Sequence, residues 1–500
     1  MISFRIHSSQ HLEMKSLYPV PTKKSCHRDL HYYFFTPSQL NINKQCIDLS
    51  KLGMKLTSHA RYSSPSFSIL ELLDLNNKIS PLTILRNFVD NKKNGSVSSL
   101  IHETQNLANA YRHESKKTLS LLKKCFEDKK KNTDYNLVKE LTVRWYTNTN
   151  ELFMVYRELL KKIDERFSPD NLIRIAFHWA DEYMSLSAEK DGLEIYFLLE
   201  PDYSTFNILM SQIMKVVRTE SSHRQEMNYE TGDNSSSNNS EEKYTYRKSS
   251  LKKWAQSVLY LIPKQSKAPQ RINFILAALA AGVAMAFAIM TALYATLNLT
   301  ENTMSWALFM IMAYVFKDRI KEGLKAVINV VLPKLMADRI FIYRSPRSER
   351  ILCRTRQKIN IVSSEKVPST IRNIRKDDNN PFRKMMPPED VVHFSNYYKF
   401  FRFKKKVEKE TPWVEQLAII TRLRMDDWLK EMDDTPSEVF GTEEENEETN
   451  KLVAQRIYHI HLVVEDHYES NNTSVYYHYL IVAKKDGIVR IEELPSDFNK

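Results

Sequence analysis

The chain has 500 residues, of which 42% are hydrophobic and 27% are charged, and its formal net charge is +12. This composition is typical of a folded protein of two or three domains and excludes a wholly disordered chain. The eight glycines are scattered, with no two within ten residues of each other. That spacing excludes a Walker A loop, a Rossmann fingerprint and a G-x-S-x-G nucleophile elbow. Four widely separated cysteines are typical of a reducing compartment rather than of a disulfide framework.

The N-terminal region, residues 1–65, is predicted to contain strand and loop. Its first residues lack the apolar core of a cleavable signal peptide, and residues 1–27 are polar and expected to be frayed. The aromatic run at residues 31–35 (HYYFF) ends shortly before Pro37 and predicts a strand. A helix is expected at residues 47–62.

Residues 66–220 are predicted to form a cytoplasmic helical bundle, because apolar residues recur there at spacings of three, four or seven. Ser168-Pro169-Asp170 is a typical helix start, with proline at the first helical position. His178 is expected to be a surface or packed residue of this bundle rather than a metal ligand. Residues 221–250 are rich in serine, asparagine and glutamate and are predicted to be a polar linker.

Residues 274–297 (FILAALAAGVAMAFAIMTALYATL) contain no charge and predict a transmembrane helix. At ~1.5 Å per residue they extend over roughly 36 Å, enough for a hydrocarbon core of ~30 Å. A second apolar run at residues 302–316 is short, and we expect it to complete a two-helix transmembrane hairpin, with a re-entrant or interfacial helix as the alternative. An interfacial helix from residue 251 and an amphipathic helix ending near residue 336 are predicted to flank the hairpin.

Basic and aromatic residues on both sides of the hairpin are expected at the membrane interface, and the turn between the helices contains neither lysine nor arginine. The positive-inside rule therefore predicts that both termini are cytoplasmic. The predicted interface residues are Trp254, Arg271, Lys317, Arg319, Lys321 and Lys325. Within the first helix, Ala278, Gly282 and Ala286 are four residues apart and predict a face for close helix packing.

Residues 337–500 are predicted to form a basic α+β domain. Residues 317–406 contain 23 Lys and Arg against 9 Asp and Glu, so their net charge is 23 − 9 = +14. This excess favours anionic lipid headgroups as partners over nucleic acid, since no nucleic-acid-reading motif accompanies it. A helix is expected at residues 411–432, an acidic loop at residues 431–449, and an antiparallel β-meander at the end of the chain.

Histidines of the predicted meander are the candidate metal ligands. His459 and His461 are two residues apart on a predicted strand and so share a face, and His478 follows on the next strand. Two histidines on one strand and a third from its neighbour can hold zinc. Solvent-exposed histidines on the open face of a sheet are the alternative, and we predict no bound cofactor or metal.

These expectations combine into a membrane protein of the α+β class, with the two-helix hairpin between the helical domain and the C-terminal domain. We expect a membrane-anchored cytoplasmic scaffold or regulatory protein that acts through an unidentified protein partner, with a homo-oligomer also allowed. A membrane-tethered metal-dependent hydrolase is the first alternative, and an oligomeric channel or transport accessory is the second. The clean asymmetry of Lys and Arg favours a bacterial inner membrane.

Overall fold

The computed structural model describes most of the chain, and its contacts divide the molecule into two units. The described residues are 2–21, 24–40, 42, 49–91, 96–127, 134–229, 238–298, 304–376, 389–403, 411–434, 436–442, 449–469 and 472–495. A β-rich unit comprises Met1–Ala60, Leu261–Lys404 and Ala418–Lys500, and a helical unit comprises Arg61–Tyr260 and Lys405–Leu417. Residues 1–60 therefore belong with the C-terminal strands.

The β-rich unit contains an antiparallel sheet of eight strands in the order β14-β13-β12-β3-β8-β7-β6-β5 and a sheet of four strands in the order β1-β2-β9-β4. The strands of the larger sheet are β3 (Cys26–Thr36), β5 (Ile262–Gln265), β6 (Arg339–Arg344), β7 (Ile351–Ser363), β8 (Asp390–Phe400), β12 (Tyr458–Tyr468), β13 (Thr473–Lys484) and β14 (Gly487–Leu494). Those of the smaller sheet are β1 (Ile2–Ser8), β2 (His11–Pro19), β4 (Leu56–Tyr62) and β9 (Gln416–Arg424). A separate hairpin pairs β10 (Ser437–Thr442) with β11 (Thr449–Ala454), and residues 443–448 of the expected acidic loop lie outside the described residues.

Alternation along the strands gives the larger sheet a buried face and an open face. In β7, Thr355 and Gln357 are buried, whereas Arg356 between them is exposed and Arg354 is half-buried. The predicted β-meander is confirmed by the pairing of β12 with β13 and of β13 with β14. Gly487 at the last turn has φ +156°, and a Cβ there would lie 2.7 Å from the Ser9 carbonyl oxygen, so only glycine fits without a shift.

Two helix predictions differ from the structure: one is wrong, and the other is only partly confirmed. Residues 411–432 contain β9 and the short helix α13 (Asp426–Lys430) instead of one long helix. Within residues 47–62, the helix α1 (Leu49–Lys55) gives way to β4. In β9, consecutive residues are buried from Leu417 to Thr421, so side chains on both faces of the strand are covered. Such a run cannot be distinguished from a buried helix by periodicity.

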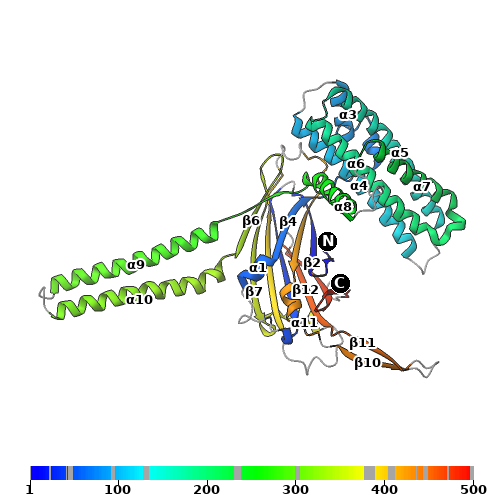
Figure 1. The fold of residues 1–500 in the computed structure, drawn as a ribbon. Helices are drawn as coiled ribbons and strands as arrows, with labels where there is room; N and C mark the ends of the chain where they lie inside the picture. Colours follow the sequence, from blue (N-terminus) through cyan, green and yellow to red (C-terminus); the bar gives the residue numbers. More distant parts are fainter. Residues whose placement is uncertain are drawn as a thin grey trace. The chain divides into compact units, whose positions relative to one another are not determined.

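The helical unit is built around the 28-residue helix α6 (Leu172–Leu199), which contacts four neighbouring helices (Figure 1). These neighbours are α4 (Val97–Glu127), α5 (Tyr135–Arg166), α7 (Tyr203–Glu226) and α8 (Asn238–Ser257). Two short helices, α2 (Ile69–Leu73) and α3 (Pro81–Asn91), complete the unit. α8 begins within the stretch expected to be a polar linker, so part of that stretch is helical.

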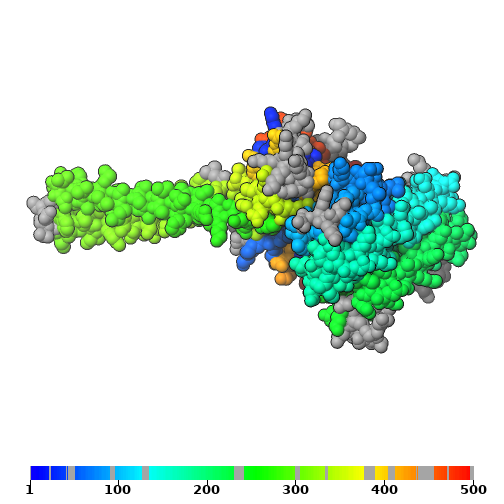
Figure 2. Space-filling view, turned by 90° about the horizontal axis from the view of Figure 1, so that it is seen from above, coloured from blue at the N-terminus to red at the C-terminus, as the bar shows by residue number. Residues whose placement is uncertain are grey.

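Helices α9 (Ala268–Asn298) and α10 (Met304–Leu335) lie side by side as an antiparallel pair (Figures 1 and 2). The predicted hairpin of two membrane spans is wrong: among the described residues, α9 is the one helix long and apolar enough to cross a membrane. α10 does not qualify because its apolar run is followed at once by Lys317, Asp318, Arg319 and Lys321. A charge-free segment as short as that run does not cover the hydrocarbon core.

Candidate functional site

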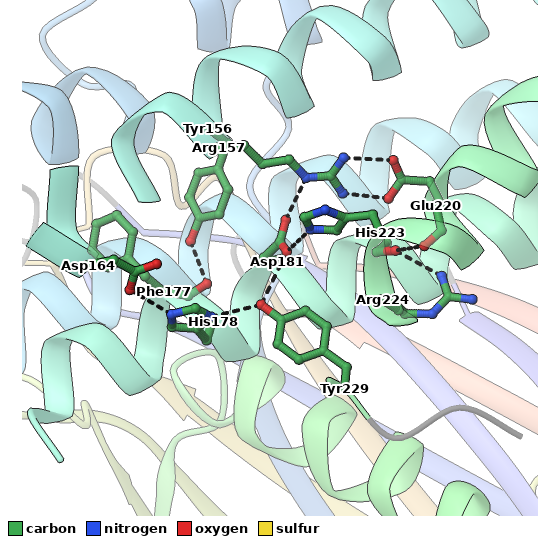
Figure 3. A network of polar contacts seen from close by, with 11 residues as sticks. Tyr156, Arg157, Asp164, Phe177, His178, Asp181, Glu220, His223, Arg224 and Tyr229 are labelled. Carbon is green, nitrogen blue, oxygen red and sulfur yellow. Dashed lines mark hydrogen bonds and ion pairs between the residues drawn. The ribbon is translucent and has the colours of Figure 1, made fainter. Parts of the chain in front are cut away.

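A network of buried charges around α6 is the most connected polar cluster of the helical unit (Figure 3). Its centre is the carboxylate of Asp181, a side chain only 2% exposed. Arg157 of α5 donates from Nε to Asp181 at 3.1 Å, and Nε2 of His223 in α7 lies 2.7 Å from the same carboxylate. Arg157 also donates from both terminal nitrogens to Glu220, at 3.0 and 2.7 Å. One arginine therefore joins α5 to both α6 and α7.

The network continues through Tyr229, which follows α7. The Tyr229 hydroxyl donates to Asp181 at 3.3 Å and lies 2.9 Å from Nδ1 of His178. The other ring nitrogen of His178 lies 2.8 Å from Asp164, which also forms an ion pair with Arg174 at 2.7 Å. Because the Tyr229 hydroxyl directs its hydrogen to Asp181, its oxygen can accept a hydrogen bond from Nδ1 of His178. His178 is thus a packed residue of the bundle, held by two polar contacts.

Further along α6, other carboxylates are neutralised in the same way. Glu182 accepts hydrogen bonds from Arg247 of α8, the shortest at 2.6 Å. Asp191 accepts two from Arg112 of α4, at 2.7 and 2.8 Å, and one from Ser115 at 2.6 Å. Each buried carboxylate of α6 therefore meets a cation from another helix, which is the condition for burying a charge without a large penalty.

The surroundings fix the protonation of this cluster. Burial opposes ionisation of Asp181, but the hydrogen bond from His223 and the charge of Arg157 outweigh it and lower the pKa of the carboxyl. Burial favours the neutral form of Arg157, but the hydrogen bond with Glu220 outweighs this effect and raises the pKa of the guanidinium group. Burial and the charge of Asp181 raise the pKa of Tyr229. Asp181 is held ionised and Tyr229 protonated, so this pair is suited to fixing helices rather than to exchanging protons near neutral pH.

The network reaches the surface at an open hollow of about 470 Å³ beside α7. Arg157 and His223 line its floor, and Lys215, Arg218 and Glu226 are among the side chains around it. Arg157 is already bound to two carboxylates, so the floor of the hollow has little remaining capacity for a ligand. Within the described parts of the chain, no group of three or more His, Cys, Asp or Glu is arranged to hold a metal ion.

The histidines predicted as metal ligands are only partly brought together. Nδ1 of His461 lies 3.2 Å from Nε2 of His478, and both side chains are buried. His459 is exposed and opposite Val482 in the strand pairing. Two histidines in contact with each other are fewer donors than a zinc site uses.

The residues predicted for membrane contact and for helix packing lie in different environments in the structure. Trp254 packs edge-on against Trp179 in the core of the helical unit, with ring centroids 5.4 Å apart, and so has a protein environment. Ala278, Gly282 and Ala286 are exposed on α9, whose buried residues are Ala280, Ala284 and Ala295. The packing face is rotated from the predicted one because alanines are frequent all around this helix. Arg271, Arg319 and Lys325 are exposed, and Lys317 and Lys321 are half-buried.

Sequence reasoning missed Asp181, Glu220, His223 and Tyr229 altogether. The available signal was the Asp181-Glu182 pair inside an otherwise well-packed helix, because acidic residues are rarely buried without a partner. The partners lie on other helices, and nothing in the local pattern identifies them.

Comparison with protein-family models, with curated proteins and with solved structures finds no match for this chain.

Proposed function

We propose that the protein is a membrane-anchored scaffold or regulatory protein that inserts α9 into a lipid bilayer. The observation that carries the anchor is the exposure of an apolar helix. The most apolar 18-residue window of α9 has a mean hydropathy of 2.3, yet only 11% of that window is buried inside the protein. A core helix of a water-soluble protein would be mostly buried, and large exposed apolar surfaces mark contact with a membrane or partner.

The charges beside α9 support this placement. Lys264, Lys267 and Arg271 precede its apolar stretch, and the positive-inside rule then favours a cytoplasmic location for this end of the helix.

The scaffold role is proposed from the helical unit. Its ion pairs join α6 to neighbouring helices rather than pointing to an outside ligand, which favours a rigid platform. Large apolar side chains nevertheless remain exposed near the junction of α6 and α7: Phe197 is 61% exposed and Ile208 is 70% exposed. Such residues are suited to contact with a protein partner.

The anchor is tested by alkaline carbonate extraction of membranes from cells that express the full chain. The wild type is expected in the pellet. Val283→Lys should release the protein or lead to its degradation, because a lysine at the centre of a membrane helix costs about 2.5–3.5 kcal/mol.

Two substitutions serve as controls for the anchor. Val283→Leu keeps the residue apolar and should stay in the pellet. Val330→Lys makes the same change in the charged half of α10 and should also stay there. Extraction of the wild type by carbonate would overturn the anchor.

The scaffold role is tested separately by photocrosslinking in intact membranes. A crosslinker at Phe197 or Ile208 should give discrete adducts with a protein partner, whereas one at the exposed polar position Lys139 should not. Equal, diffuse labelling from all three positions would contradict the scaffold role and leave the anchor unaffected.

A further inference from the structure

The open face of the eight-stranded sheet carries a row of cations on β7. Arg354, Arg356 and Lys358 occupy every second position and therefore project to the same side, while the residues between them are buried. The strand register places Arg354 directly opposite Lys399 of β8. Like charges directly opposite each other on neighbouring strands destabilise a sheet. The protein therefore maintains a local repulsion that a bound anion would relieve.

These cations line a hollow of about 470 Å³ on the β-rich unit. Tyr397 of β8 and His27 and Asp29 of β3 form its other side, and Met336 and Ala337, which follow α10, close one end. The register continues the row across three strands, because Lys399 is opposite both Arg354 and His27. The hollow is therefore built from adjacent strands rather than from a flexible loop.

The guanidinium groups of this hollow have no counterion among the residues that the structure describes. Within the described ranges, no salt bridge involves Arg354, Arg356 or Lys399, and Nε of Arg354 is a buried atom without a hydrogen-bond partner. The hollow does contain two carboxylates, and one of them, Glu469, is already held by His27 at 2.6 Å. Four cations against two carboxylates leave the hollow positive.

We propose that this hollow binds a phosphate group, with Arg354 and Arg356 as the principal ligands and Lys358 and Lys399 as supporting charges. Guanidinium groups donate two parallel hydrogen bonds to phosphate oxygens and are preferred where such recognition matters. None of the sites described above combines two guanidinium groups in this way. The proposal goes beyond membrane anchoring and does not depend on α9 entering a bilayer.

Two neighbouring groups are compatible with an anion in this position. Burial raises the pKa of the Asp29 carboxyl, which weakens its preference for the charged form beside an anion. Further along β8 on the same face, burial and the charges of His31 and Lys358 lower the pKa of His393 to about 3. His393 thus stays neutral and leaves the positive charge to the rim of the hollow.

The phosphate could come from a soluble phosphomonoester or from an anionic lipid headgroup, and the experiment distinguishes the two. Full-length protein in neutral detergent is titrated calorimetrically with inorganic phosphate and with glycerol 3-phosphate. The same protein in phosphatidylcholine nanodiscs, with or without phosphatidic acid, is melted to detect stabilisation by the lipid. Saturable binding in the first arm identifies a soluble ligand, and stabilisation by phosphatidic acid alone identifies a headgroup.

The variants are Arg354→Gln and Arg356→Gln, with the exposed Lys485→Gln as a control of equal charge change in the same unit. Each arginine variant should weaken binding about 10- to 100-fold, as expected for loss of hydrogen bonds to a charged group. Without the anion, both variants should melt no lower than the wild type, because they remove repulsion rather than a contact. The proposal is overturned if neither probe binds or if Lys485→Gln weakens binding as much as the arginine variants.

Discussion

Helices α6 and α9 are similar in length and opposite in what they bury. α6 has 28 residues and encloses Asp181, Glu182 and Asp191 among its buried positions. α9 has 31 residues, all of them described, and its buried residues are three alanines. Large apolar side chains of α9, such as Phe274 and Leu279, are exposed. One helix therefore hides its charges inside protein, and the other presents its apolar surface outward.

The comparison teaches that burial follows the available partners and solvent rather than hydropathy alone. A carboxylate can be buried in α6 because an arginine or histidine from another helix meets it. An apolar helix can remain uncovered where the surrounding medium is hydrocarbon instead of water. The two helices are therefore expected to respond in opposite ways to changes in charge, pH and side-chain volume.

The largest expected effect comes from removing the central carboxylate of α6. Asp181→Ala removes the acceptor of His223 and leaves Arg157 with Glu220 as its one carboxylate partner in this network. Breaking a buried pair in this way costs about 3–5 kcal/mol, because the remaining charge stays desolvated. Thermal unfolding of the full-length protein in detergent, followed by circular dichroism, should show a clearly lower midpoint, while retention in membranes should not change.

Glu158→Ala is the matched control for that substitution, because Glu158 is an exposed carboxylate on α5. Exposed substitutions of this kind usually change stability by about 0.5 kcal/mol or less. Equal effects of the two variants would show that the network does not stabilise the helical unit.

The next expected effect is that of acidification, which should destabilise the helical unit around α6 and leave the membrane retention of α9 unchanged. The pKa of Asp181 is lower in the folded protein than its ordinary value. A lowered carboxyl pKa contributes stability that is fully present above the unfolded value, about 3.9, and is lost as the pH falls through the folded value. We expect the helical unit to lose stability progressively as the pH falls below roughly 4, and to lose less in Asp181→Asn.

The apolar stretch of α9, residues 274–297, contains no Asp, Glu, His, Lys or Arg. Its retention in membranes should therefore be constant over the same pH range. The test is to measure the amount of carbonate-resistant protein after acid pre-treatment. If the chain is released from membranes at the pH where the helical unit unfolds, α6 and α9 do not differ in their response to pH.

The sequence predicts regular elements well where one pattern dominates. The β-meander follows from strict alternation, and α9 follows from a long uncharged stretch. The prediction of a second membrane span was wrong because the 13 apolar residues at 304–316 are followed at once by Lys317 and further charges, which leave an apolar segment too short to cross the bilayer. The helix predicted at residues 411–432 was wrong because both faces of β9 are buried, which gives the same continuous apolar run as a buried helix.

The candidate site was less accessible to sequence reasoning. Contact between His461 and His478 could be anticipated, since one hairpin brings both strands together. Asp181 and His223 are separated by 42 residues and meet only when α6 and α7 pack. Helix periodicity states which residues share a face, but not which residue of another helix lies opposite that face.

The smallest expected effect uses one substitution in both helices. A Cβ at Gly192 of α6 would lie 2.9 Å from Val217 and 3.0 Å from Trp145, whereas a Cβ at Gly282 of α9 would meet nothing within 4 Å. Gly192→Ala should therefore destabilise the helical unit by about 1–2 kcal/mol through overpacking, despite the better helix propensity of alanine. Gly282→Ala should be neutral or stabilising by up to about 1 kcal/mol.

Melting midpoints of the two glycine variants, measured in the same nanodiscs, give the comparison its most sensitive test. If Gly192→Ala is tolerated, the core of the helical unit is looser than the contacts of α6 indicate. If Gly282→Ala is destabilising, the open side of α9 cannot face lipid chains, which would adapt to one methyl group. A closely packed helix must then cover that side, and a second copy of this chain would be the first candidate, because small residues such as Ala278 and Gly282 allow close helix approach in membranes.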